Sequence, residues 1–97
     1  MSRTLTLICY DIADPKRLRA VFELCRSYGD PVQYSIFIAR LTAMARAELL
    51  AELTSIIHHH LDRVLLIRLG PDTEETMSRF EGLGRQAIPT DDDFSIY

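Results

Sequence analysis

The chain of 97 residues is predicted to be a single α+β domain, in which one antiparallel sheet carries two helices on one face. The order of hydrophobic patterns predicts this fold: strand, helix, strand region, helix, strand. Both predicted helices begin at capping residues, and the stretches 3–12 and 63–69 are rich in strand-forming side chains. This order matches the split β-α-β unit of a ferredoxin-like fold, β-α-β-β-α-β.

Residues 3–12, RTLTLICYDI, predict the first strand. The segment alternates at first and becomes apolar on both faces near its end, as a central strand does. A helix follows almost directly, because Asp14 is a typical N-cap and Pro15 suits the first helical position. Its apolar positions recur at helical spacing, and Gly29 is predicted to be the C′ residue at its end.

Residues 32–41, VQYSIFIARL, return to a period of two and predict strand structure. Val32, Tyr34, Ile36 and Ile38 form one side of this pattern; Gln33, Ser35, Phe37 and Ala39 form the other. Thr42 is a suitable cap for the second helix. The apolar stripe predicted for that helix is Leu49, Leu53, Ile56, Ile57 and His60. Residues 63–69 predict another strand, which Gly70-Pro71 ends.

The signals weaken after residue 78. The core is therefore predicted to span about residues 1–78, with a C-terminal extension over about 79–97. A short strand is predicted within residues 79–88 and another in DFSIY, residues 93–97, with PTDDD as a linker. With both helices on one face, the other face of the sheet needs a cover, and a second copy of the chain is the simplest one.

Composition limits the classes of function. The net charge of −3 argues against a dedicated nucleic-acid binder. The charge is uneven, however, because residues 1–48 carry seven Lys/Arg and five Asp/Glu, whereas residues 49–97 carry four and nine. No secretory signal or transmembrane run is recognisable, so no membrane partner is expected. The two cysteines are interpreted as reduced core residues of a cytoplasmic protein.

Asp11 is the candidate catalytic residue, because it ends a strand just before a helix. It has a plain structural interpretation as a turn residue. The functional interpretation is that a rigid strand end presents the carboxylate beside a helix start that favours phosphate. One carboxylate is a poor Mg²⁺ site. In a two-fold dimer, however, the two Asp11 side chains could share one ion that activates water against a phosphodiester.

Several other polar groups are candidate sites. Lys16, Arg17 and Arg19 lie in the first turns of the helix after Asp11, as either a solvated face or a phosphate-binding edge. The run His58-His59-His60 is not expected to bind a metal, because adjacent helical residues point about 100° apart. Asp91-Asp92-Asp93 is interpreted as a solvated linker.

Three segments resemble the CRISPR-associated protein 2 family: YDIADPKR at 10–17, YGDPVQYSIF at 28–37 and FEGLGR at 80–85. The resemblance implies a ferredoxin-like homodimer whose final strand, here Phe94 to Tyr97, pairs with the sheet of the other protomer. It also implies spacer acquisition, in which the dimer bridges two dimers of the CRISPR integrase subunit and helps to hold duplex DNA.

The resemblance further implies a metal-dependent endonuclease acting on ssRNA or duplex DNA, with Mg²⁺ (or Mn²⁺) bound by Asp11 of both protomers. By the same resemblance, Arg17 and Arg19 are expected to contact phosphate, and Tyr10 and Phe37 are expected to support the site. Two positions depart from the family pattern: Pro31 replaces an arginine, and Ile38 replaces a frequent glutamate. Two alternatives stay open, namely a non-catalytic DNA-binding scaffold and a toxin-like ribonuclease of the virulence-associated family.

Overall fold

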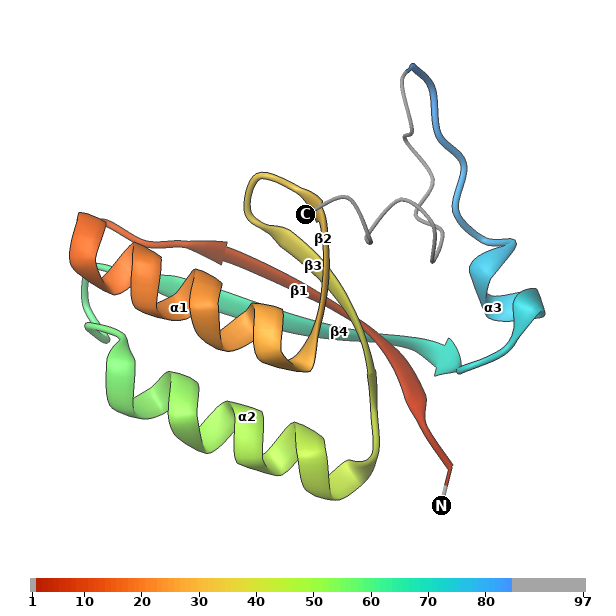
Figure 1. Ribbon diagram of the computed structural model, residues 1–97, viewed down its shortest axis with the longest axis horizontal. Helices are drawn as coiled ribbons and strands as arrows, with labels where there is room; N and C mark the ends of the chain where they lie inside the picture. Colours follow the sequence, from red (N-terminus) through yellow and green to blue (C-terminus); the bar gives the residue numbers. More distant parts are fainter. Residues whose placement is uncertain (1, 85–97) are drawn as a thin grey trace.

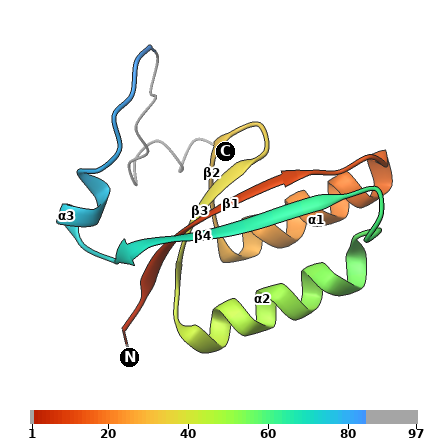
Figure 2. The ribbon, with the colours of Figure 1, turned by 180° about the vertical axis from the view of Figure 1, so that it is seen from behind.

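The computed structural model describes residues 2–84 of the chain. Within this range the elements follow in the order β1 (Thr4–Asp11), α1 (Pro15–Tyr28), β2 (Gly29–Gln33), β3 (Ile36–Leu41), α2 (Ala43–Ile56), β4 (Arg63–Pro71) and α3 (Glu74–Met77). The strands form one antiparallel sheet in the order β2-β3-β1-β4. Helices α1 and α2 lie side by side along the same side of this sheet (Figures 1 and 2). The predicted ferredoxin-like arrangement is confirmed.

The predicted helix starts are confirmed by their capping geometry. Asp14 Oδ2 accepts hydrogen bonds of 3.0 Å from the backbone N–H groups of Lys16 and Arg17, and Pro15 is the first helical residue. Thr42 Oγ1 accepts a bond of 3.1 Å from the N–H of Ala45. These caps satisfy N–H groups that have no partner within the helix.

Gly29 follows α1 as predicted, but its backbone is extended, with φ −158°, and it begins β2. Gly29 was therefore predicted at the right position, but the predicted reason, a left-handed C′ residue, was wrong. A Cβ on Gly29 would collide with the carbonyl oxygen of Ile38 and would lie 2.8 Å from Ala39 Cβ. Glycine is needed here because β3 approaches the backbone closely, not because the helix end requires a left-handed residue.

The alternating stretch 32–41 is two strands rather than one continuous pattern. The chain turns at Tyr34 and Ser35, so that β2 and β3 form a hairpin. Tyr34 lies in this turn and is 87% exposed. Phe37, Ile38 and Ala39 are all buried in β3, which lies between β2 and β1 in the sheet.

The main core lies between the sheet and the two helices. The largest fully buried side chains include Phe37, Ile8, Leu49 and Val21, which come from both layers. Cys25 is buried in α1 and Cys9 is half-buried in β1, and both are free thiols. The interpretation of Cys25 as a small core residue is confirmed, and burial raises the pKa of its thiol to about 12.

The predicted second helix ends earlier than its apolar stripe suggested. Helix α2 stops at Ile56, and His60 lies exposed in the turn that follows. Within residues 2–84, no group of three or more His, Cys, Asp or Glu side chains is placed to hold a metal ion. None of the helices in this range has the length and apolar run that a membrane crossing requires.

The end of the described chain contains one element that sequence patterns missed. Residues Glu74–Met77 form the short helix α3, which Thr73 caps with its hydroxyl. Residues 80–84 form no strand, and the rest of the stretch 79–88, in which a short strand was predicted, lies outside the described residues. The predicted linker 89–93 and the predicted final strand 93–97 lie outside the described residues.

Candidate functional site

Asp11 is the last residue of β1, and its side chain lies on the face of the sheet that α1 and α2 do not cover. Successive side chains of a strand alternate between its faces. Ile8 and Tyr10 belong to the core on the helix side, so Leu7, Cys9 and Asp11 share the opposite face. Asp11 is exposed, and its carboxylate is therefore accessible to an ion or a ligand.

Two apolar rows cross this helix-free face beside Asp11. Each row has one side chain from β3, one from β1 and one from β4. The rows are Ile36–Cys9–Leu65 and Ile38–Leu7–Ile67. Leu65 and Ile67 are 53% and 44% exposed. An apolar sheet face that is this open is typical of a surface that receives a partner.

Arg63 lies directly opposite Asp11, as the first residue of β4. Opposed residues of an antiparallel pair are close enough for their side chains to interact. Arg63 therefore places a cation beside the Asp11 carboxylate. Sequence analysis did not select Arg63, because only the register between β1 and β4 brings these positions together.

The turn after Asp11 is held in place by a residue distant in the sequence. Asp62 Oδ1 accepts a bond of 2.9 Å from the N–H of Ala13, and Asp62 Oδ2 accepts one of 2.8 Å from the N–H of His58. Arg17 Nε donates to Asp62 Oδ2 at 2.7 Å. The hydrogen bond from Arg17, with those from His58 and Ala13, holds the pKa of Asp62 well below its usual range.

The three side chains of the predicted basic edge lie in the first turns of α1, but they differ in their hydrogen bonding. Lys16 and Arg19 are exposed on α1, whereas Arg17 is bound to the Asp62 carboxylate and is one quarter exposed. The N–H groups of Lys16 and Arg17 already donate to Asp14, so they are not open donors for a phosphate. Lys16 and Arg19 are the side chains of this edge that point to solvent.

Tyr10 and Phe37 lie on the other side of the sheet from Asp11. Both are buried in the core, with their ring centroids 6.3 Å apart and an interplanar angle of 28°. Phe22 of α1 contacts Phe37 edge-on, with ring centroids 5.4 Å apart. These rings fix the strand that ends at Asp11, but they do not face its carboxylate.

The two departures from the family pattern occupy structural positions. Pro31 lies in β2, which is an edge strand, and this is where a sheet tolerates proline. Ile38 is 3% exposed in β3 and belongs to one of the apolar rows. Neither position offers a charged group near Asp11.

The donor set at Asp11 fits Mg²⁺ only in part within one chain. Mg²⁺ takes oxygen ligands and keeps several waters, with one or two carboxylates from the protein. An exposed carboxylate at a rigid strand end meets this preference. Strand β1 contributes one acidic side chain to this face, and a second copy of the chain could supply a second carboxylate.

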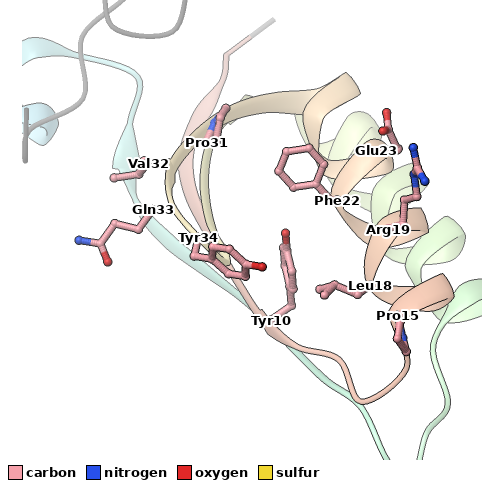
Figure 3. A pocket seen from close by; sticks show the side chains of 10 residues that line it. All are labelled: Tyr10, Pro15, Leu18, Arg19, Phe22, Glu23, Pro31, Val32, Gln33 and Tyr34. Carbon is pink, nitrogen blue, oxygen red and sulfur yellow. The ribbon is translucent and has the colours of Figure 1, made fainter. Parts of the chain in front are cut away.

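A cavity of about 600 Å³ lies between α1 and the β2–β3 hairpin (Figure 3). Its lining is mainly apolar and includes three aromatic rings together with Arg19 of the basic edge. The lining includes Tyr10, Leu18, Arg19, Phe22, Gln33 and Tyr34. Sequence analysis missed this cavity, since the turn that carries Tyr34 contains no glycine or asparagine to mark it.

The fold and the site define a class: a small ferredoxin-like protein with an accessible carboxylate at the end of a central strand, an open apolar sheet face and a basic helix edge. Residues 4–77 match the model of the family described as CRISPR associated protein Cas2. The chain belongs to this family.

Named relatives and a solved structure agree with this assignment. The chain is 41% identical over 88 residues to "CRISPR-associated endoribonuclease Cas2 1" of Rhodospirillum rubrum, covering 84% of this chain and 86% of that protein. It is 38% identical over 71 residues to "CRISPR-associated endonuclease Cas2" of Halalkalibacterium halodurans, covering 68% of this chain and 74% of that protein. The structure of Streptococcus pyogenes Cas2 at pH 6.5 superposes with a TM-score of 0.73 at 34% identity, covering 82% of this chain and 99% of that one.

Proposed function

We propose that this chain is a nucleic-acid-binding subunit of CRISPR spacer acquisition that works as a symmetric dimer and cleaves phosphodiester bonds with Mg²⁺. The names of the relatives support the nuclease class. The observation that carries the proposal is the position of Asp11: it is exposed, and it lies on the same sheet face as the two apolar rows, whose β4 residues are about half exposed.

This shared face supports a dimeric site. A second copy that packs on the helix-free face buries Leu65 and Ile67, which are otherwise about half exposed. Strand β1 lies between β3 and β4, near the middle of the sheet. A two-fold axis close to β1 therefore brings the two Asp11 carboxylates toward each other. Each protomer then supplies one of the two carboxylates that Mg²⁺ takes from a protein.

In this dimer the two Asp11 side chains would hold the ion, and bound Mg²⁺ (or Mn²⁺) supplies activation of water and neutralisation of phosphate charge. The residues of the chain position the nucleic acid. Arg63 provides a cation beside Asp11, and Lys16 and Arg19 provide further cations along α1. Asp62 keeps the turn between Asp11 and α1 in a fixed position.

A second candidate function is a scaffold without catalysis. The basic edge of Lys16 and Arg19 is exposed independently of Asp11, so binding of nucleic acid does not require the carboxylate. In this case the dimer would hold duplex DNA and bridge dimers of the integrase subunit. The two functions are compatible within one protein, and the role of Asp11 separates them.

The experiment compares cleavage of end-labelled ssRNA and duplex DNA by the wild type, Asp11→Asn and Asp14→Asn, each with Mg²⁺ and with EDTA. Asp14→Asn is a matched control, because it removes a carboxylate three residues away and asparagine still caps the helix. We expect Mg²⁺-dependent cleavage by the wild type and Asp14→Asn, and a loss of at least about 100-fold in Asp11→Asn.

Each other result has a definite meaning. Absence of cleavage by every protein, with nucleic-acid binding retained, favours the scaffold. Equal cleavage by the wild type and Asp11→Asn contradicts the role of Asp11. Integration assays with the integrase subunit then test the scaffold function directly. If the protein acts only as a scaffold, the Asp11→Asn variant keeps its integration activity.

A further inference from the structure

The hydroxyl of Tyr10 is a buried polar group without a partner. Tyr10 is 7% exposed, and among the described residues its hydroxyl oxygen has no hydrogen-bond partner. Burial raises the pKa of this hydroxyl to about 12. Buried polar atoms are nearly always hydrogen-bonded, because an unpartnered one keeps the full cost of its lost hydration. A group that can donate and accept is therefore left unsatisfied inside the protein.

This hydroxyl belongs to the wall of the cavity between α1 and the β2–β3 hairpin. Figure 3 shows it directed into the space between Phe22 and Tyr34, with Leu18 on the other side of the Tyr10 ring. The cavity volume of about 600 Å³ is within the range of small-molecule sites. Its mainly apolar wall with few polar groups is also typical of such sites.

The arrangement of rings suits a flat occupant. Phe22 and Tyr10 come from α1 and β1 and are held by packing against Phe37. Tyr34 comes from the hairpin turn and is 87% exposed, so its ring can rotate quickly over the cavity. A planar ring can enter beneath Tyr34, stack on it and reach the Tyr10 hydroxyl.

Polar groups at the mouth of the cavity distinguish one end of the occupant from the other. Arg19 is an exposed cation on α1, and Glu23 lies one turn later on the same helix face. Arg19 suits a phosphate, whereas the Glu23 carboxylate suits an exocyclic amino group.

We propose that this cavity binds a single unstacked nucleobase, with its ring against Tyr34 and Phe22, a polar edge at the Tyr10 hydroxyl and its phosphate at Arg19. The base comes either from a free nucleotide or from an unpaired position in a bound strand. The second case rests on the proposed function. Stacking on aromatic side chains and splaying of single bases are general features of single-strand recognition. The amino-accepting rim favours adenine over uracil.

The first test uses free nucleotides and therefore does not depend on the proposed function. AMP, UMP and ribose 5-phosphate are titrated into the ¹⁵N-labelled protein. We expect AMP to shift the amide signals of Phe22, Gln33 and Tyr34, and to bind more tightly than UMP. Ribose 5-phosphate, which lacks the base, serves as the control and should leave these signals in place. Equal shifts from all three compounds would reduce the site to a phosphate contact and overturn the inference.

The second test places the base in a strand. A duplex with one unpaired 2-aminopurine is compared with the fully paired duplex. Binding of the wild type should quench the fluorescence of the unpaired base. Tyr34→Ala should abolish the quenching and weaken binding by about five- to 150-fold, which is the range for one base–aromatic stack. Leu61→Ala is the matched control, since Leu61 is also exposed but does not line the cavity.

Tyr10→Phe removes only the unpartnered hydroxyl. The folded protein should be as stable as the wild type or more so, while affinity for AMP falls by about two- to ten-fold. Tyr28→Phe is the control, because Tyr28 is at the other end of α1 and does not line the cavity. A stable Tyr10→Phe variant with unchanged AMP affinity would contradict a contact between the base and this hydroxyl.

Failure of the inference and failure of the proposed function are distinguishable. Tight binding of the paired duplex without quenching of the unpaired base, together with no AMP response, overturns the base site and leaves the proposed function intact. An AMP response without binding of any strand supports the base site for free nucleotides and overturns nucleic-acid binding.

Discussion

The guanidinium of Arg17 binds the carboxylate of Asp62 through two hydrogen bonds, with Nε 2.7 Å from Oδ2 and Nη2 3.2 Å from Oδ1. The same carboxylate accepts from the backbone N–H groups of Ala13 and His58. The start of α1, the turn after β1 and the connection from α2 to β4 therefore meet at one side chain. This side chain is fully buried and determines where the turn after Asp11 lies.

Asp62→Asn should reduce stability in a manner that depends on pH. The Arg17 hydrogen bond lowers the pKa of Asp62 in the folded state. Its stabilisation is therefore complete above the pKa of the unfolded carboxyl, about 4, and is lost as the pH falls below that value toward the folded pKa. We expect Asp62→Asn to lower Tm by roughly 5 °C or more at pH 7. The difference from the wild type should shrink below about pH 4.

Thermal unfolding monitored by circular dichroism between pH 2 and pH 8 measures this effect. Asp30→Asn is the control, because Asp30 lies in the edge strand β2, away from this contact. A Tm difference between the wild type and Asp62→Asn that is constant over the whole pH range would contradict the assigned role of the ionised carboxylate.

Lys16→Ala and Arg19→Ala should each weaken nucleic-acid binding by a similar factor for every nucleotide sequence. Both side chains are exposed on α1, so their loss leaves the core unchanged. Each removed phosphate contact should lower the slope of log K against log salt concentration by about 1. Fluorescence anisotropy of a labelled duplex at several salt concentrations gives the slope. Arg68→Ala, near the far end of β4, should leave it unchanged.

Ile67→Lys should dissociate the proposed dimer. Ile67 is 44% exposed on the helix-free face, where a buried lysine would lack an anionic partner. Self-association should weaken by at least about 100-fold, because an unpaired buried charge is strongly unfavourable. Sedimentation equilibrium measures it. Leu61→Lys changes an exposed leucine outside this face and should not alter association. An Ile67→Lys protein that still dimerises would indicate that another surface pairs.

Gly29→Ala should destabilise the fold by about 1–3 kcal/mol, because the added methyl group meets backbone and Cβ atoms that cannot rotate away. The neighbours are the carbonyl oxygen of Ile38 and the Cβ of Ala39. Since the φ angle of Gly29 is extended, backbone strain does not contribute. Urea denaturation measures the change in free energy of unfolding. An unchanged midpoint would mean that β2 and β3 separate at little cost.

The parts of the fold that sequence predicted well depend on local interactions. Asp14, Pro15 and Thr42 begin helices through contacts within four residues, and the periodicity of β1 and β4 follows from which side chains are buried. The hairpin at Tyr34 and Ser35 was harder to locate, since the turn contains no glycine, proline, asparagine or aspartate and the alternation continues through it. Its position depends on how β3 packs between β2 and β1.

The candidate site, like the fold, was predictable only where it depends on neighbouring residues in the sequence. Asp11 stands out in the sequence because it ends a strand next to a basic helix. Arg63 and Asp62 do not, because their relation to Asp11 and Arg17 depends on strand register and on contacts over 45 residues or more. The cavity is likewise a product of tertiary packing, since it joins Tyr10 to residues of α1 and of the hairpin.

Pro31 makes one edge of the sheet unsuited to pairing with a further strand. It lies in β2, at one edge of the sheet, where it has no N–H to offer and where the pairing with β3 is irregular. Proline and a bulge at an edge both discourage the addition of another strand. An extended segment from a neighbouring molecule is thus directed to β4, at the opposite edge. A residue that departs from the family pattern thereby makes the two edges of the sheet unequal: the β4 edge accepts a further strand, and the β2 edge does not.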